Sequence, residues 1–234
     1  MPLITDIRTL GASRSQTRPS HPQRGGEWRL VVLDDGRRLR VDAEQVARHG
    51  LEPGEPVGPR LVAGLAARDA YLRARERALR LLAVRSRSIE ELRQRLIHGR
   101  APRSAVRAVI ADLAAQGYLD DLAFARAWIS HRIAAGPVAA LWIRWELRQK
   151  RVPAVVIDQA VREGLGAGSD LARAEEQSAI ALATRRLPGY RHLSPDRQMR
   201  RLAALLGRRG FGPATIVRAL RVLGKAEVLE EPDG

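Results

Sequence analysis

Three segments of this 234-residue chain repeat one pattern of five apolar positions. In each copy the successive positions are four, five, five and four residues apart. The copies are Leu92, Leu96, Ala101, Val106 and Ile110; Ile143, Leu147, Val152, Ile157 and Val161; and Leu202, Leu206, Phe211, Ile216 and Leu220. An interval of four places side chains on one face of a helix, so each copy predicts two helices joined by a turn.

The segments around each copy support a unit of three helices. The turn is basic every time and is followed by Pro102, Pro153 or Pro213, which suits the first position of a helix. A longer helix is expected before each pair, over 69–85, 121–135 and 170–186. Ser88 and Glu91 form a capping box, and a glycine is expected to end each third helix, at Gly117, Gly164 and Gly224. This internal similarity is typical of stacked arrays.

The first 60 residues have a different pattern. Residues 28–41 alternate around Asp35-Gly36, a favoured turn pair, and predict a β-hairpin. A polar segment over 11–27, rich in Gly, Pro and Ser, is expected to be a flexible loop. We therefore expect a mainly α fold with three tandem three-helix repeats in a curved array, preceded by a small β-rich N-terminal module. The expected parts are 1–60 for the module, 61–117, 118–168 and 169–224 for the repeats, and 225–234 for an acidic tail.

The charge of the chain indicates an anionic partner. Lys and Arg number 41 against 26 Asp and Glu, a net charge of +15. An excess of this size is typical of proteins that contact nucleic acid, an anionic membrane or an acidic protein surface. The absence of cysteine excludes disulfides and thiolate metal sites. No apolar run is long enough for a membrane span and no signal-peptide pattern is present, so a cytoplasmic location is expected.

No constellation for catalysis or metal binding emerges from the sequence. The five histidines lack ligand spacing, and the glycine-rich segment 164–168 lacks the lysine of a phosphate-binding loop. Adjacent carboxylates on a helix diverge by about 100° and do not converge as an acid–base pair. We therefore predict no metal, no cofactor and no enzymatic activity.

Two adjacent aspartates precede the helix expected over 121–135, within the stretch GYLDDLAFARAWI. They could bind a metal, activate a water or start the helix. Asp120 suits an N-cap, and Asp121 in the first turn suits the positive end of the helix dipole. Helix initiation is sufficient to explain both residues, since a metal needs more oxygen ligands than this loop supplies.

Two stretches resemble signatures of the RecX family, regulators of the RecA recombinase. GYLDDLAFARAWISHR is similar to the central signature, with Asp120, Asp121, Phe124 and Ala125 at the matching positions. IRWELRQKRV is similar to a second block, which contains Glu146 and Leu147. The resemblance implies a crescent of three helical repeats, no catalysis, and binding to RecA–DNA filaments with inhibition of RecA. It implies a place in DNA repair, homologous recombination and the SOS response.

The sequence departs from the family at two places. The family usually has glycine at the turn position of Arg151, where a left-handed Arg costs about 1 kcal/mol. The stretch 138–142, commonly basic in the family, is Val-Ala-Ala-Leu-Trp here.

Basic residues of the first two repeats are the candidate contacts with RecA or DNA. They are Arg93, Arg95, Arg100, Arg103, Arg126, Arg132, Arg144, Arg148, Lys150 and Arg151. Each could instead belong to a solvated helix face or complement a helix dipole. Trp142 and Trp145, with Trp128, favour core packing over a binding surface.

Two functions remain open at this point. The first is a monomeric regulator that binds the RecA filament on single- or double-stranded DNA, away from any membrane. The alternative is an independent DNA-binding protein built from helix-turn-helix-like repeats.

Overall fold

The structure, a computed structural model, describes residues 1–10 and 27–230, with side chains through residue 224. It divides into two compact units, each described below by itself. The N-terminal unit comprises Met1–Val84 and Arg93–Asp112, and the C-terminal unit comprises Arg85–Leu92 and Leu113–Gly234. The loop expected over 11–27 lies outside the described residues, apart from Glu27.

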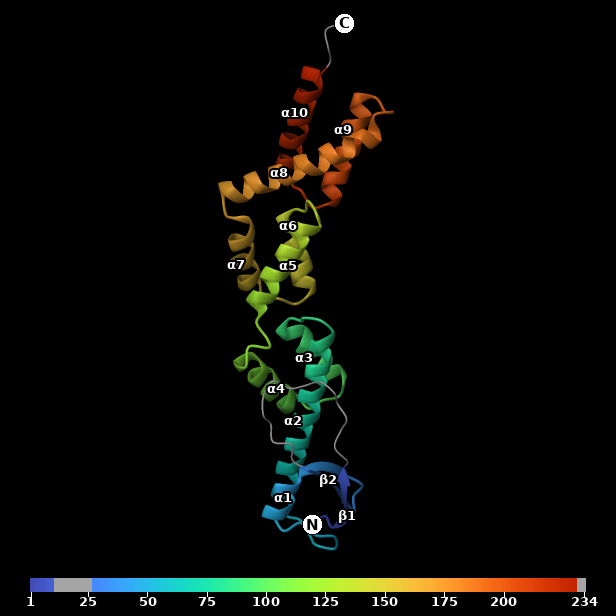
Figure 1. The fold of residues 1–234 in the computed structure, drawn as a ribbon, viewed down its shortest axis with the longest axis vertical. Helices are drawn as coiled ribbons and strands as arrows, with labels where there is room; N and C mark the ends of the chain where they lie inside the picture. The colour runs from blue at the N-terminus through green and yellow to red at the C-terminus, as the bar shows by residue number, and fades with distance from the viewer. Residues whose placement is uncertain (11–26, 231–234) are drawn as a thin grey trace. The chain divides into compact units, whose positions relative to one another are not determined.

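A small antiparallel sheet opens the N-terminal unit (Figure 1). Its strands, in the order β1-β2-β3, are β1 (Ile4–Leu10), β2 (Trp28–Leu33) and β3 (Arg38–Asp42), and the short helix α1 (Ala43–Arg48) follows. The hairpin predicted around Asp35-Gly36 is confirmed, with Val31 of β2 opposite Leu39 of β3. The apolar face of the sheet packs on the first turns of α2 (Pro59–Val84), where Val62 and Leu65 are buried.

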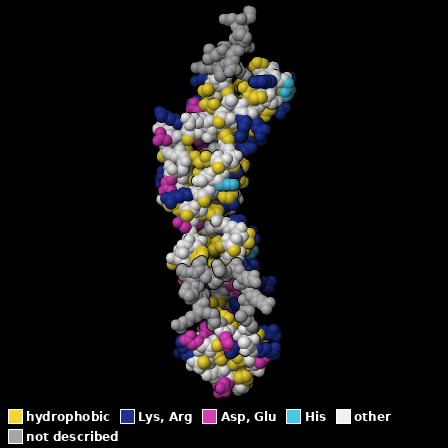
Figure 2. All heavy atoms as spheres, viewed as in Figure 1, with side chains coloured by type: hydrophobic (Ala, Val, Ile, Leu, Met, Phe, Trp, Pro, Cys, Tyr) yellow, Lys and Arg dark blue, Asp and Glu magenta, His cyan; other side chains and the backbone are white. Residues whose placement is uncertain are grey.

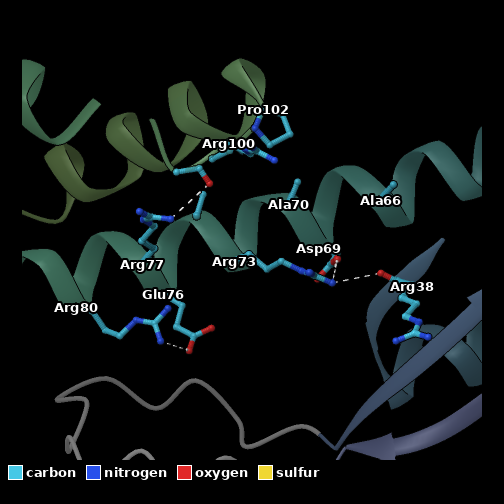
Figure 3. A pocket seen from close by; sticks show the side chains of 13 residues that line it. Arg38, Ala66, Asp69, Ala70, Arg73, Glu76, Arg77, Arg80, Arg100 and Pro102 are labelled. Carbon is cyan, nitrogen blue, oxygen red and sulfur yellow. Dashed lines mark hydrogen bonds and ion pairs between the residues drawn. The ribbon is translucent and has the colours of Figure 1, made fainter. Parts of the chain in front are cut away.

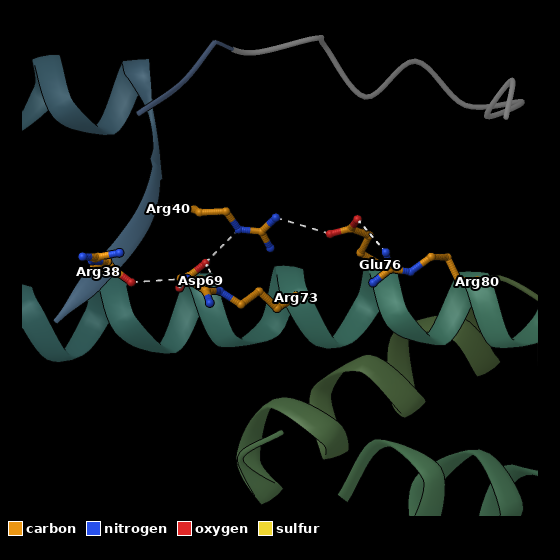
Figure 4. Close-up of polar contacts among 6 residues, drawn as sticks. All are labelled: Arg38, Arg40, Asp69, Arg73, Glu76 and Arg80. Carbon is orange, nitrogen blue, oxygen red and sulfur yellow. Dashed lines mark hydrogen bonds and ion pairs between the residues drawn. The ribbon is translucent and has the colours of Figure 1, made fainter. Parts of the chain in front are cut away.

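Helix α2 is longer than predicted, and Asp69 does not start it. The helix begins at Pro59, ten residues before the expected start, because its first turns cover the sheet. Asp69 instead lies mid-helix with its carboxylate buried between two arginines (Figure 4). Arg40 Nε lies 3.1 Å from Asp69 Oδ1, and Arg73 Nη2 lies 2.8 Å from Oδ2. Buried charges require such partners, and a pattern of single residues does not reveal them.

Helices follow in three groups of three, so the predicted mainly α fold with a small N-terminal sheet is confirmed (Figure 1). The first group is α2, α3 (Ile89–His98) and α4 (Arg103–Ala115). The second is α5 (Asp121–Ala135), α6 (Ala140–Gln149) and α7 (Ala154–Leu165). The third is α8 (Ser169–Arg186), α9 (Pro195–Arg208) and α10 (Pro213–Glu230), with the 3-10 helix η1 (Leu187–Tyr190) after α8.

One turn geometry explains the repeated spacing of four, five, five and four. The second helix of each group ends in a left-handed residue, followed by an apolar one whose N–H bonds back five positions. These bonds join Ala101 to Leu96, Val152 to Leu147 and Phe211 to Leu206, at 3.2, 3.1 and 3.2 Å. The apolar pair packs together, which fixes the first interval of five. Twelve of the fifteen repeat positions are buried, and Ala101, Ile216 and Leu220 are partly buried.

Only one of the three glycines expected to end a third helix does so. Gly117, with φ of 76°, ends α4 as predicted. The prediction was wrong for Gly164, which lies inside α7 where an added Cβ would come within 3.0 Å of Ile129 Cγ2. Its role is close packing against α5. The prediction was also wrong for Gly224, because α10 continues through this residue to Glu230.

Candidate binding surface

Glu146 joins α5 to α6 in the C-terminal unit. Its carboxylate accepts hydrogen bonds from Trp128 Nε1 at 2.9 Å and Trp142 Nε1 at 3.1 Å. Arg132 Nη2 lies 2.9 Å from the same carboxylate, whose side chain is 15% exposed. Three donors therefore compensate one largely buried charge. The sequence-predicted residues Arg132 and Glu146 are brought together here as a support for the helix pair rather than as free contacts.

Three further candidate contact residues interact with other side chains of the same chain. Lys150 Nζ lies 4.0 Å from the centre of the Trp128 ring, in cation–π geometry. Arg144 pairs with Asp158 at 3.2 Å, and Arg126 pairs with Glu163 at 2.6 Å. The hydrogen bond from Arg126 lowers the pKa of Glu163, and the same bond raises the pKa of Arg126. These cations are partly neutralised within the chain.

The remaining candidates are exposed around the turns of the first two repeats. Within the described residues, the guanidinium groups of the following five have no ion pair or side-chain hydrogen bond: Arg95, Arg100 and Arg103 in the N-terminal unit, and Arg148 and Arg151 in the C-terminal unit. Arg93 is exposed as well, and with Arg103 it lines a groove between α3 and α4. Arg107, which the sequence analysis missed, lines the same groove; its spacing of four from Arg103 was the available signal.

Two of these arginines hold an unusual backbone conformation. Arg100 and Arg151 have φ of 63° and 61°, at the left-handed position that Gly210 occupies in the third repeat. Arg151, which stands where the family usually has glycine, therefore keeps the same left-handed turn conformation. Gly210 has a steric reason of its own, because an added Cβ would lie 3.2 Å from Trp142 Cβ.

The aspartate pair starts two different helices. Asp120 caps its own helix, as predicted, by accepting from the N–H groups of Leu122 and Ala123 at 2.8 and 3.0 Å. The expectation for Asp121 was incomplete, because its carboxylate accepts from the N–H of Ile89 at 2.9 Å and caps α3.

Buried Ser88 adds a second link between helices, because it accepts from the N–H of Glu91 and donates to the Lys150 carbonyl. Spacing within one helix could not reveal these links between helices.

The other signature residues form the core of the second repeat. Ala125 and Leu147 are buried, and Phe124, Trp128 and Trp142 pack against them. The core role predicted for Trp128 and Trp142 is confirmed, whereas Trp145 is 48% exposed. No group of three or more His, Asp or Glu able to hold a metal occurs in the part of the chain that the structure describes.

Charge is spread over the visible face. Figure 2 shows Lys and Arg side chains on both units, with acidic side chains among them on the sheet and around α7. Within the part of the chain that the structure describes, the five candidate arginines without an ion pair lie in and beside the turns between α3 and α4 and between α6 and α7.

Comparison with known proteins identifies the family. A profile described as RecX, second three-helix domain, matches residues 120–161, and one described as RecX, third three-helix domain, matches residues 174–220. The regulatory protein RecX of Streptomyces coelicolor is 34% identical over 154 residues, which are 66% of this chain and 79% of the relative. This chain belongs to the RecX family. The RecX of Thermobifida fusca is 33% identical over 162 residues, 69% of this chain and 84% of that protein.

Solved RecX structures share the fold. One crystal structure of regulatory protein RecX aligns with a TM-score of 0.63 and 21% identity, over 92% of this chain and 97% of the other. The RecX of Lactobacillus salivarius aligns with a TM-score of 0.59 and 16% identity, over 67% of this chain and 97% of the other. The relatives are named regulatory proteins. Among the described residues of this RecX chain, no helix is long and apolar enough to cross a membrane.

Proposed function

We propose that this RecX chain is a non-enzymatic regulator of DNA repair and recombination that binds the RecA filament on DNA and inhibits RecA. The observation that carries the proposal is the set of exposed arginines in and beside the turns of the first two repeats, whose guanidinium groups have no ion pair with any residue that the structure describes. A filament of protein on DNA offers a polyanionic surface, and arginine suits phosphate and carboxylate oxygens through its planar fork of donors. The proposal places the chain in the cytoplasm as a monomer.

Two features of the turns favour a binding role over a purely structural one. Cations at a helix end complement the helix dipole, but that effect needs no left-handed backbone. Arg151 holds the strained conformation and remains exposed. Strain at an exposed polar residue is typical of functional sites.

The decisive experiment measures ATP hydrolysis by RecA on single-stranded DNA with and without this protein. Inhibition at amounts below one protein per RecA monomer is expected. No inhibition, together with tight binding to naked duplex, would instead favour an independent DNA-binding protein.

A pair of charge reversals tests the contact surface. Arg148→Glu with Arg151→Glu should weaken inhibition by tenfold or more, since two attractive contacts become repulsive. Lys150 is left intact because it packs on Trp128. Arg197→Glu with Arg201→Glu on α9 is the matched control, since both residues are exposed and the net charge changes equally. Equal inhibition by the two double variants would contradict the proposed surface.

A further inference from the structure

A basic groove of about 500 Å³ lies within the N-terminal unit, outside the turns considered above except for Arg100. It is formed by the start of β3, one face of α2 and the turn between α3 and α4 (Figure 3). Its ionisable lining consists of five arginines and two acids: Arg38, Arg73, Arg77, Arg80, Arg100, Asp69 and Glu76.

The two acids of this groove are already paired. Asp69 lies between Arg40 and Arg73, and Glu76 lies 3.3 Å from Arg40 and 3.5 Å from Arg80 (Figure 4). A buried or doubly paired carboxylate does not neutralise a further cation. These pairs occupy Arg40, Arg73 and Arg80, so the arginines of the groove that are not held in an ion pair by its two acids are Arg38, Arg77 and Arg100.

Those three arginines lack acidic partners among the described residues. Within the described residues, Arg77 donates only to the carbonyl of Gly99, at 3.4 Å. Arg38 and Arg100 are exposed, and their guanidinium groups have no ion pair or hydrogen bond in the described part of the chain. The guanidinium groups of Arg38 and Arg100 and the remaining donors of Arg77 are thus available to bind an anion, and a guanidinium fork can hold two phosphate oxygens.

The backbone of Arg100 adds an independent indication. Its φ of 63° costs about 1 kcal/mol for a residue with a Cβ, and glycine would relieve that cost. Figure 3 shows Arg100 beside Pro102 on the side of α2 that carries Arg77 and Ala70. Strain that places a free cation in a groove points to a ligand.

The shape and lining of the groove suit a strand of phosphates better than a single small anion. It follows α2 from Ala66 to Arg80, roughly 20 Å of helix. Grooves that track a nucleic-acid backbone have this elongated form. The lining contains no aromatic side chain, so bases have nothing to stack on and contact is confined to the backbone.

We propose that this groove binds the phosphodiester backbone of a nucleic-acid strand, without base preference, through Arg38, Arg77 and Arg100. The inference goes beyond the proposed function, because it gives the groove between β3, α2 and the turn after α3 a ligand that requires no recombinase. The sheet then has a specific role, since β3 supplies Arg38 and, through Arg40, the cation that pairs with both acids.

The test measures fluorescence anisotropy of a fluorescein-labelled single-stranded oligonucleotide with the full chain and no RecA. Arg38→Gln, Arg77→Gln and Arg100→Gly should each weaken binding by roughly three- to tenfold and lower the salt slope by about 1. Arg100→Gly should also unfold at an equal or higher temperature, which separates lost binding from a damaged fold. Arg60→Gln, an exposed arginine on α2 outside the groove, is the control and should bind like the parent.

Two results would overturn the inference. One is unchanged affinity and salt slope in all three groove variants, which would place strand binding elsewhere. The other comes from a fluorescein-labelled poly-glutamate peptide: if the variants lose that peptide but keep the oligonucleotide, the groove takes an acidic protein. A loss of RecA inhibition would test the proposed function and not this groove, because the binding assay contains no RecA.

Discussion

At the scale of single residues, Glu146 should contribute strongly to stability. Its carboxylate holds two indole N–H groups and one guanidinium from α5 and α6. Glu146→Ala would leave those donors unpaired in a largely buried site, so the free energy of unfolding should fall by roughly 2–4 kcal/mol. Urea denaturation measures the change. Glu163→Ala removes an exposed ion pair and should lower the free energy of unfolding far less; equal losses would contradict the buried-hub interpretation.

Glu91 should give the C-terminal unit an acid-sensitive contact. Burial alone would raise its pKa, but hydrogen bonds from Arg85 and Arg87 outweigh burial, and the pKa lies below the ordinary value of 4.5. The contribution of Glu91 is therefore complete above pH 4.5 and is lost as the pH falls through the folded-state pKa. Urea denaturation of the parent and Glu91→Gln should give a constant stability difference from pH 7 to 5 that shrinks toward pH 3. A difference that stays constant to pH 3 would contradict this account; Glu52→Gln, an exposed carboxylate, is the control.

At the scale of elements, the turn between α6 and α7 has a strained backbone and the same geometry as the corresponding turns of the other two repeats. Arg151 occupies the left-handed position where the third repeat has Gly210. Arg151→Gly should therefore raise the free energy of unfolding by about 0.5–1 kcal/mol. Arg148→Gly, three residues earlier inside α6, should lower it by about 1 kcal/mol. Thermal unfolding of both variants checks the opposite signs, and a loss of stability in both would show that the turn needs its arginine for the fold.

The elements also show how far sequence alone reaches. Spacing predicted the helix pairs because Leu147 and Val152 follow a local turn geometry that leaves its mark in the sequence. The bounds of α5 were predicted correctly because Asp120 caps its own helix. The link from Asp121 to Ile89 could not be predicted, since it joins helices 32 residues apart. The start of α2 was missed for the same reason: the sheet that covers its first turns is a long-range partner.

The candidate site was predicted less completely than the fold. The sequence pointed to basic residues of the first two repeats but could not separate paired from unpaired arginines. Arg126, Arg132 and Arg144 proved to have acidic partners, whereas Arg148 and Arg151 did not. Pairing depends on tertiary contacts between helices, which the local pattern does not encode. The domain boundaries at 60, 117 and 168 stay a prediction.

At the scale of the whole molecule, the two strained arginines lie in different compact units. Arg100 belongs to the N-terminal unit and Arg151 to the C-terminal unit. If both units hold one extended polyanion, each contact contributes separately and the losses of binding free energy add. The protein carrying Arg100→Gly and Arg151→Gly together should therefore bind a single-stranded oligonucleotide with a loss equal to the sum of the single losses, within about 0.5 kcal/mol.

Anisotropy titrations at several salt concentrations measure this additivity. Each glycine variant should lower the salt slope by about 1, and the double variant by about 2, because each arginine neutralises one phosphate. Arg60→Gln supplies the control for a lost charge elsewhere on the chain. If one of the single variants binds like the parent, only one unit contacts the strand. The strained turns of the two repeats would then have different functions despite their shared geometry.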